Sequence, residues 1–224
     1  MNSYYSEKLA AKNLKECYDI APPRVKQYLL AEIQYVLHHL SPSDIVLELG
    51  SGYGRALNYL LGTCANVIGI DTSIASLRMA QMYLPTTKSI ELFEMNASSL
   101  GFRDGSFDLV LCIQNGISAF KVDPKELIME AYRVTRPGGL CLFSSYSSKF
   151  WTHRLEWFKL QAEEGLLGEI DWTQTKDGVI VCKDGFRATT YDERGFQRIL
   201  NHINLKGDII EIDESSLFCK ILKP

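Results

Sequence analysis

The chain has 224 residues and a formal net charge of −3, from 24 basic and 27 acidic side chains. A chain of this length buries about 70% of its unfolded surface in one domain, so we expect neither a disulfide nor a metal site to be needed for stability. The charge balance gives no overall attraction to nucleic acid or to anionic lipid.

The sequence predicts no targeting signal. Residues 1–5 lack a basic region followed by an apolar one, and no apolar run approaches the ~20 residues of a membrane span. The six cysteines show no paired spacing, which is typical of reduced thiols. We therefore expect a cytoplasmic protein without a membrane segment.

Two helices are predicted first. Residues 6–18 form a short helix that ends before Pro22 and Pro23. Apolar residues at i, i+3 and i+4 spacing then predict a second helix. They are Val25, Tyr28, Leu29, Ile33, Val36, Leu37 and Leu40.

A short apolar run at 45–49 follows and breaks into a turn with three glycines. They are Gly50, Gly52 and Gly54. A buried strand that turns sharply into a helix needs such residues, because a Cβ would forbid the dihedral angles and the close approach of a ligand. The next apolar run, 66–70, ends at Asp71, whose carboxylate can accept hydrogen bonds from both hydroxyls of a ribose. The pattern predicts a nucleoside site, although Asp71 could instead cap the helix that begins near Ser73.

A nicotinamide dinucleotide is a poor fit to this turn. The G-x-G-x-x-G fingerprint needs a third glycine, but Arg55 or Leu57 stands there, depending on which glycine opens the count. The sequence therefore disfavours an oxidoreductase.

Strands and helices alternate over the rest of the first two thirds of the chain. Helices are predicted from Gly54, Ser73 and Asp123, and further strands at 90–95, 108–113 and 140–144. Alternation of this kind indicates a parallel sheet with helices on both faces.

Residues 147–191 depart from this alternation. Basic and aromatic side chains alternate over 149–159, a pattern that can stack on nucleobases, but their helical spacing favours a buried stripe. The Asp-Gly steps at 177–178 and 184–185 predict an antiparallel meander of strands 170–176, 179–183 and 186–190. A helix around Phe196 and strands at 205–212 and 217–222 complete the chain.

The glycine-rich turn resembles the first motif of the class I S-adenosylmethionine-dependent methyltransferases, with Glu48 as its acid. Asp71 matches the ribose-binding acid of that family, and Asn96-Ala97 matches the pair near the adenine. Residues 107–112 and 136–140 resemble the fourth strand and the loop into the fifth. The likeness covers about residues 44–146. Asn96 departs from the usual aspartate and keeps a hydrogen-bonding side chain without its charge.

This resemblance implies an α/β fold with a doubly wound, mostly parallel seven-stranded sheet, helices on both faces and an antiparallel last strand, to which we add the meander near 170–190. It also implies one domain with four parts: a helical lid (1–42), a donor-binding core (43–146), a substrate-pocket insertion (147–191) and a C-terminal helix with two strands (192–224). Tyr4, Tyr5 and Tyr18 are candidate lid residues, although a core role is commoner for tyrosine.

The resemblance further implies S-adenosyl-L-methionine as cofactor, S-adenosyl-L-homocysteine as product and no metal. The residues expected to bind the cofactor are Glu48, Gly50, Ser51, Gly52, Gly54, Asp71, Thr72, Asn96, Ala97 and Gln114. Asn115 next to Gly116 fits a turn residue equally well. His153 is the one histidine near the expected acceptor pocket, but a lone histidine is more often structural, so no catalytic residue is assigned.

The expected reaction is in-line methyl transfer to a small-molecule acceptor with a nitrogen or oxygen nucleophile. Methylation of a protein or RNA is an alternative that predicts an open, charged groove. A regulatory module that binds the donor without turnover is another. A monomer and a homodimer are both compatible with the sequence.

Overall fold

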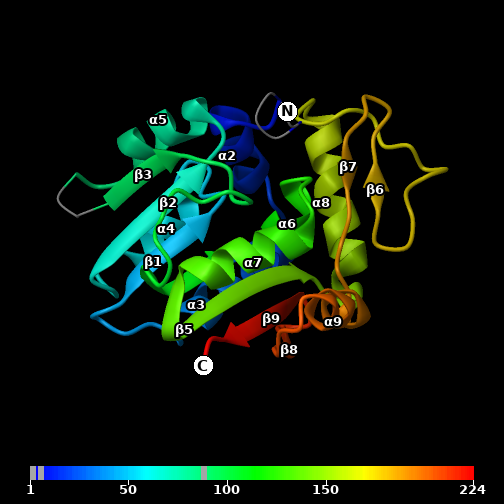
Figure 1. The fold of residues 1–224 in the computed structure, drawn as a ribbon. Coiled ribbons are helices and arrows are strands. Elements are labelled where there is room, and N and C mark those ends of the chain that lie inside the picture. The colour runs from blue at the N-terminus through cyan, green and yellow to red at the C-terminus, as the bar shows by residue number, and fades with distance from the viewer. Residues whose placement is uncertain (1–3, 5–7, 87–89) are drawn as a thin grey trace.

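The computed structural model describes residues 4, 8–86 and 90–224 (Figure 1). Within these residues, seven strands form one sheet in the order β3-β2-β1-β4-β5-β9-β8. The strands are β1 (Ile45–Leu49), β2 (Asn66–Asp71), β3 (Ile90–Glu94), β4 (Phe107–Cys112), β5 (Thr135–Tyr146), β8 (Asp208–Ile212) and β9 (Ser216–Leu222). β1 to β5 pair in parallel, whereas β9 runs antiparallel to both β5 and β8. The predicted sheet is confirmed, with β9 as its antiparallel strand.

Helices pack on both faces because side chains alternate along each buried strand. Val46 of β1 belongs to an apolar cluster with residues of three helices. They are α3 (Pro23–Leu37), α4 (Arg55–Leu60) and α5 (Ile74–Tyr83). Its neighbour Leu47 belongs to the cluster on the opposite face. The helices there are α7 (Pro124–Val134) and α9 (Glu193–His202).

A third apolar cluster lies beyond the carboxyl ends of the strands and joins segments far apart in sequence. Its elements include α2 (Ala11–Asp19), η1 (Ser148–Phe150), α8 (Trp151–Glu163) and the hairpin of β6 (Ile180–Val181) and β7 (Arg187–Ala188). The short helix α6 (Gly116–Ala119) lies between β4 and α7, and its Ile117 belongs to the cluster of α7 and α9. In Figure 1, α2, α6 and α8 stand at the end of the sheet toward which the arrows of β1 and β2 point. None of the helices in the described part of the chain is both long and apolar enough to cross a membrane.

The predicted meander is a two-stranded hairpin, so the strand expected at 170–176 is wrong. Only isolated bridges form there, at Ile170 and Lys176. The carboxylate of Asp171 accepts hydrogen bonds from the backbone and hydroxyl of Thr173 and from Gln174, which folds this segment into a turn. The Asp-Gly turn at 177–178 is confirmed, since both residues have positive φ and Lys176 and Val179 exchange backbone hydrogen bonds.

Several boundaries differ from those predicted. The start expected for the first helix, at Ser6 beside Tyr5, lies outside the described residues, within which α2 begins at Ala11. α3 ends at Leu37, short of Leu40. β5 begins at Thr135, five residues earlier than expected, because Thr135 already pairs with Phe107 across a bulge.

Candidate functional site

A cavity of about 450 Å³ lies where the carboxyl ends of β1, β2 and β4 meet α2 and α8. This volume is within the roughly 300 to 1,000 Å³ typical of small-molecule sites. Nine of the ten residues predicted to bind the cofactor line it, namely Glu48, Gly50, Ser51, Gly52, Asp71, Thr72, Asn96, Ala97 and Gln114. The tenth, Gly54, does not. The chain order reverses between β1 and β4, so the cavity sits at the switch point of the sheet.

The three glycines of the turn after β1 all have positive φ, from +55° to +86°. A Cβ on Gly50 would lie 2.4 Å from Cε1 of Phe120, so the positive φ and this contact together favour glycine here. A Cβ on Gly54 would meet Leu84 at 2.8 Å, away from the cavity. Gly50 and Gly52 therefore shape the cavity wall, whereas Gly54 shapes the entry into α4.

Asp71 holds the glycine-rich turn in place. Its Oδ2 accepts a hydrogen bond from the backbone of Gly52 at 2.9 Å, and its Oδ1 accepts one from the backbone of Ser73 at 2.8 Å. The N-cap of α5 is Ser73, whose hydroxyl accepts a hydrogen bond from the backbone of Ser76. Asp71 is therefore not the N-cap itself, although it supports the start of α5 through its bond to Ser73. Each carboxylate oxygen can accept a further hydrogen bond, which leaves Asp71 able to receive ribose hydroxyls. Burial raises its pKa, opposed by these backbone hydrogen bonds.

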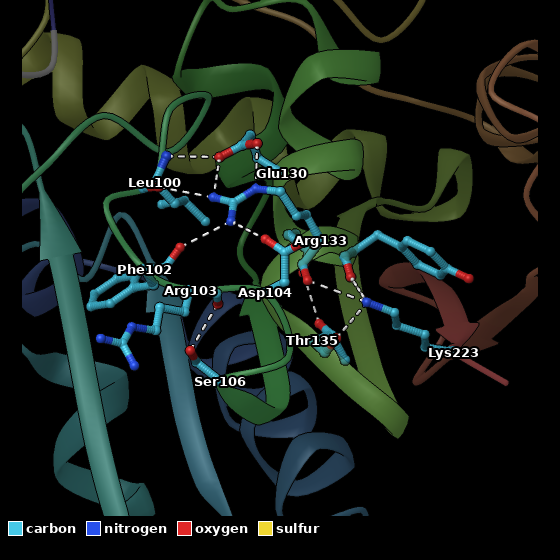
Figure 2. A network of polar contacts seen from close by, with 11 residues as sticks. Leu100, Phe102, Arg103, Asp104, Ser106, Glu130, Arg133, Thr135 and Lys223 are labelled. Atoms are coloured by element: carbon cyan, nitrogen blue, oxygen red, sulfur yellow. Dashed lines mark hydrogen bonds and ion pairs between the residues drawn. The ribbon is translucent and has the colours of Figure 1, made fainter.

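Asn96 lies in the loop after β3, where its Oδ1 accepts hydrogen bonds from the backbone and hydroxyl of Ser98. The rest of this loop is tied to α7 by Arg133, as Figure 2 shows. The Arg133 guanidinium donates to the carbonyl oxygens of Leu100 and Phe102, each at 2.9 Å, and pairs with Glu130. These contacts fix the loop that carries Asn96 and Ala97.

Two consecutive residues after β4 have left-handed backbones, Gln114 with φ +57° and Asn115 with φ +63°. The Gln114 amide oxygen accepts from the hydroxyl of Tyr18 on α2 at 3.3 Å. The Asn115 side chain accepts from Ser145 at 2.8 Å and donates to the carbonyl of Thr189 at 2.9 Å. Asn115 is thus a turn residue that also lines the cavity and holds the insertion to the sheet.

Arg55, which directly follows the glycine turn, is a lining residue that the sequence-based prediction missed. Its guanidinium lies 4.4 Å from the ring centroid of Tyr18. The sequence could have indicated this residue, because a cation beside a predicted nucleoside site is a candidate to bind an anionic group of the ligand.

Five buried polar atoms at this cavity have no hydrogen-bond partner within the described residues. They are Oε2 of Glu48, Oγ of Ser51, Nε and Nη2 of Arg55, and Nε2 of Gln114. An unsatisfied buried polar atom is expensive, so a set of them around one cavity points to a polar ligand. Burial raises the pKa of Glu48 to about 8, opposed by the charge of Arg55. Nε and Nη2 form the side of the guanidinium that binds a carboxylate with two hydrogen bonds.

The apolar part of the cavity comes from α2 with the residues before it and from α8 and the hairpin segment. Leu9, Leu14, Cys17 and Tyr18 line it from one side, and Trp157, Phe158 and Phe186 from the other. Trp157 Nε1 donates to the carbonyl of Cys17 at 2.8 Å, which joins the two sides.

His153 does not reach this pocket, so the prediction that placed it there is wrong. Its side chain is 45% exposed on α8, with Nδ1 4.0 Å from Glu156. The helical spacing that buries Arg154, Trp157 and Phe158 turns His153 outward. Within the described chain, no histidine lines the cavity.

Comparisons with known proteins agree with this geometry. A family model described as a methyltransferase domain matches residues 47–143. An uncharacterized methyltransferase of Synechocystis sp. is 29% identical over 76% of this chain and 74% of its own length. A ubiquinone/menaquinone biosynthesis C-methyltransferase of Legionella pneumophila is 33% identical over 77% of this chain and 64% of its own.

Two other curated relatives are much longer than the region they share with this chain. They are a 2-methyl-6-phytyl-1,4-hydroquinone methyltransferase of Synechocystis sp., 28% identical over 57% of this chain, and an arsenite methyltransferase of Aquipseudomonas alcaligenes, 29% identical over 57%. The chain spans about two fifths of their length, 42% and 40%.

Solved structures share the fold. A putative S-adenosyl-L-methionine-dependent methyltransferase of Methanococcus maripaludis superposes with a TM-score of 0.68 at 16% identity, over 100% of this chain and 96% of the other. The N-methyltransferase NodS of Bradyrhizobium japonicum, solved with S-adenosyl-L-homocysteine, gives 0.63 at 15% identity over 97% and 95%.

Fold, motif and relatives agree on one kind of domain. Residues 47–143 match the model of a methyltransferase domain, and the chain shares its fold with solved S-adenosyl-L-methionine-dependent methyltransferases.

Proposed function

We propose that this protein transfers the methyl group of S-adenosyl-L-methionine to a small-molecule acceptor enclosed in the cavity. The observation that carries the proposal is a single cavity that joins the glycine-rich turn and Asp71 to an apolar, aromatic chamber under α2. A donor and an acceptor can meet there away from water.

The lining residues fit the cofactor. Asp71 accepts the ribose hydroxyls, and Asn96 and Ala97 contact the adenine. Glu48 receives the ammonium of the amino-acid end, and the free edge of Arg55 together with Nε2 of Gln114 donates to its carboxylate. The orphaned polar atoms of Glu48, Arg55 and Gln114 support this assignment.

When bound, the cofactor supplies an electrophilic methyl group on a positively charged sulfur. The protein has to align the acceptor behind that methyl and exclude water, and alignment can supply much of the rate. Tyr18, Trp157 and Phe158 are placed to hold the acceptor. We assign no general base, so the nitrogen or oxygen nucleophile binds in its reactive form.

The partly covered, mostly apolar cavity favours a small acceptor over the alternative of a protein or an RNA. A macromolecular acceptor needs an open, charged groove, whereas Leu9, Leu14 and Cys17 cover this cavity. Relatives named for a phytyl hydroquinone and for arsenite also favour small acceptors.

Calorimetric titration with S-adenosyl-L-methionine and S-adenosyl-L-homocysteine tests the proposal. We expect micromolar binding that Asp71→Ala weakens by about 100-fold, because two hydroxyl hydrogen bonds to a charged group are lost. Asp192→Ala, which removes the cap of α9 instead, is the control for a general loss of stability. Tighter binding of NAD, or no binding, would overturn the proposal.

Turnover separates the enzyme from a regulatory module. Wild-type protein and labelled S-adenosyl-L-methionine are incubated with a panel of small amines, phenols and hydroquinones, and labelled product is measured. Binding of the cofactor with no transfer to any of them would favour the non-catalytic module.

A further inference from the structure

Glu32 of α3 is fully buried, and its carboxylate is held by hydrogen bonds alone. Oε2 accepts from the backbone N–H of Gln114 at 2.6 Å and from the hydroxyl of Ser144 at 2.9 Å, while Oε1 accepts from the hydroxyl of Ser216. No ion pair of Glu32 occurs within residues 8–86 and 90–224. The carboxylate of Glu32 on α3 therefore accepts hydrogen bonds from three segments: the residue after β4, strand β5 and strand β9.

Stability does not account for a carboxylate at this position. The residues around it on the same face of α3, Leu29, Ile33 and Val36, are buried and apolar. A buried charge without a direct ion pair is costly, and an apolar side chain of similar size often serves stability as well or better. The role of Glu32 therefore has to come from the groups that donate hydrogen bonds to it.

What it holds is the unusual backbone after β4. Gln114 and Asn115 are consecutive non-glycine residues with left-handed φ, a conformation that persists only where surrounding contacts enforce it. Asn115 is fixed through its side chain by Ser145 and Thr189. Gln114 is fixed through its backbone N–H, and the acceptor is Glu32.

This backbone directs the Gln114 side chain to the cavity. Its amide oxygen accepts from Tyr18, and its Nε2 is buried with no partner in the described chain. Release of the N–H would allow Gln114 to relax toward an ordinary backbone and would move the side chain away from the ligand.

We propose that Glu32 is a positioning residue that holds Gln114 in its left-handed conformation, so that the Gln114 side chain meets the amino-acid end of the cofactor. This inference rests on the proposed function for the identity of the ligand. Glu32 itself lies outside the cavity lining.

The first test compares two ligands that differ only in the group Gln114 would contact. S-adenosyl-L-homocysteine carries the amino-acid end, and 5′-methylthioadenosine lacks it. In Glu32→Met, which removes the acceptor but keeps the length, we expect affinity for S-adenosyl-L-homocysteine to fall about tenfold. Affinity for 5′-methylthioadenosine should stay unchanged.

Two control variants separate positioning from a general structural role. Glu32→Gln keeps an oxygen that accepts the Gln114 N–H and should restore most of the lost affinity. Ser216→Ala removes a hydrogen bond from the other carboxylate oxygen without touching Gln114 and should bind both ligands as the wild type does. Equal losses for both ligands in Glu32→Met, or an equal effect of Ser216→Ala, would overturn the proposal.

A double-mutant cycle adds a second requirement. If Glu32 acts through Gln114, then Glu32→Met should cause no further loss of S-adenosyl-L-homocysteine affinity in a Gln114→Ala background. Additive losses would show that Glu32 acts by another route and would overturn the proposal.

The backbone itself gives a readout that does not depend on the ligand. The Gln114 amide proton should resonate far downfield in the wild type because of its short hydrogen bond to a carboxylate, and it should move upfield in Glu32→Met but little in Ser216→Ala. An unmoved resonance overturns the positioning role. If the wild type binds neither ligand while the resonance moves as expected, then the proposed function has failed and the positioning of Gln114 stands.

Discussion

Arg55 presents the free edge of its guanidinium to the cavity while its face lies over Tyr18. We expect Arg55→Met to weaken S-adenosyl-L-homocysteine binding by roughly 10- to 100-fold, because a carboxylate loses two charge-assisted hydrogen bonds. Calorimetry measures this loss, and 5′-methylthioadenosine should bind equally well to both proteins.

A lysine control tests the geometry of that contact. Arg55→Lys keeps the charge but loses the planar pair of donors, so it should recover only part of the affinity. Full recovery with lysine would show that charge alone matters at this position.

Gly50 should tolerate a side chain poorly. Gly50→Ala places a Cβ 2.4 Å from Phe120 on a backbone with φ +73°. We expect a loss of about 2 to 4 kcal/mol in unfolding free energy, from backbone strain and overpacking together, and a loss of ligand binding. Urea denaturation measures the first effect and calorimetry the second.

Gly138 provides the matched control. Its φ is +78°, but a Cβ there would meet no atom within 4 Å. Gly138→Ala should therefore lower the unfolding free energy only through backbone strain, by about 1 kcal/mol, and leave ligand binding intact. Similar losses in the two variants would show that the clash with Phe120 is relieved by side-chain movement.

The sequence could predict some site residues and not others. The glycines and Asp71 could be placed at the site because their spacing relative to two apolar strands is typical of a nucleoside site at a sheet edge. Glu32 was missed although it falls at i+7 from Val25, on the apolar stripe of α3, where a carboxylate is anomalous. The partners of Glu32, on β5 and β9, lie more than 100 residues away in the chain, so no local pattern reveals them.

Arg133 links two elements. It joins α7 to the loop between β3 and β4 through carbonyl oxygens of Leu100 and Phe102 and the carboxylates of Asp104 and Glu130 (Figure 2). We expect Arg133→Met to lower the unfolding free energy by about 1 to 3 kcal/mol, because two carbonyls lose their donor. Urea denaturation measures the change.

Arg136 serves as the comparison for Arg133. It forms a single ion pair with Asp108 through a side chain that is 55% exposed. Arg136→Met should therefore change the unfolding free energy by less than about 1 kcal/mol. If the two variants lose equal stability, then the bonds to the loop carbonyls contribute little.

Elements with a buried periodic pattern could be predicted closely from the sequence. β1 matches its predicted residues, and Asp123 and Ser73 cap the helices where expected. The failure at 170–176 has a different cause. The Asp-Gly step that follows this segment suggested a strand there, but the Asp171 side chain competes for the backbone donors.

Across the whole molecule, two buried carboxyl groups set the response to pH. Burial raises the pKa of Glu32 to about 7 and that of Glu48 to about 8, from 4.5. The folded protein then binds more protons than the unfolded chain between pH 4.5 and 8, so the unfolding free energy falls as pH rises through this window. Hydrogen bonds from Arg133 lower the pKa of Glu130. Glu130 therefore makes the unfolding free energy rise with pH, but only below about pH 4.5.

We expect the unfolding free energy at pH 5 to exceed that at pH 8 by on the order of 6 kcal/mol, because both groups contribute. The double variant Glu32→Gln, Glu48→Gln should flatten this dependence, whereas Glu163→Gln on the exposed face of α8 should keep it. Denaturation curves at both pH values test this, and a wild type of equal stability at pH 5 and pH 8 would contradict it.

The cover of the cavity has a kinetic consequence. Cys17 is tied to Trp157, and the backbone of Ala11 donates to the hydroxyl of Ser76 at 3.0 Å, so α2 is fastened on both sides of the chamber. We expect the release of S-adenosyl-L-homocysteine to be slowed by the need to break these two bonds. The first catalytic cycle should therefore run faster than those that follow, with the dwell time of the demethylated product setting the steady state.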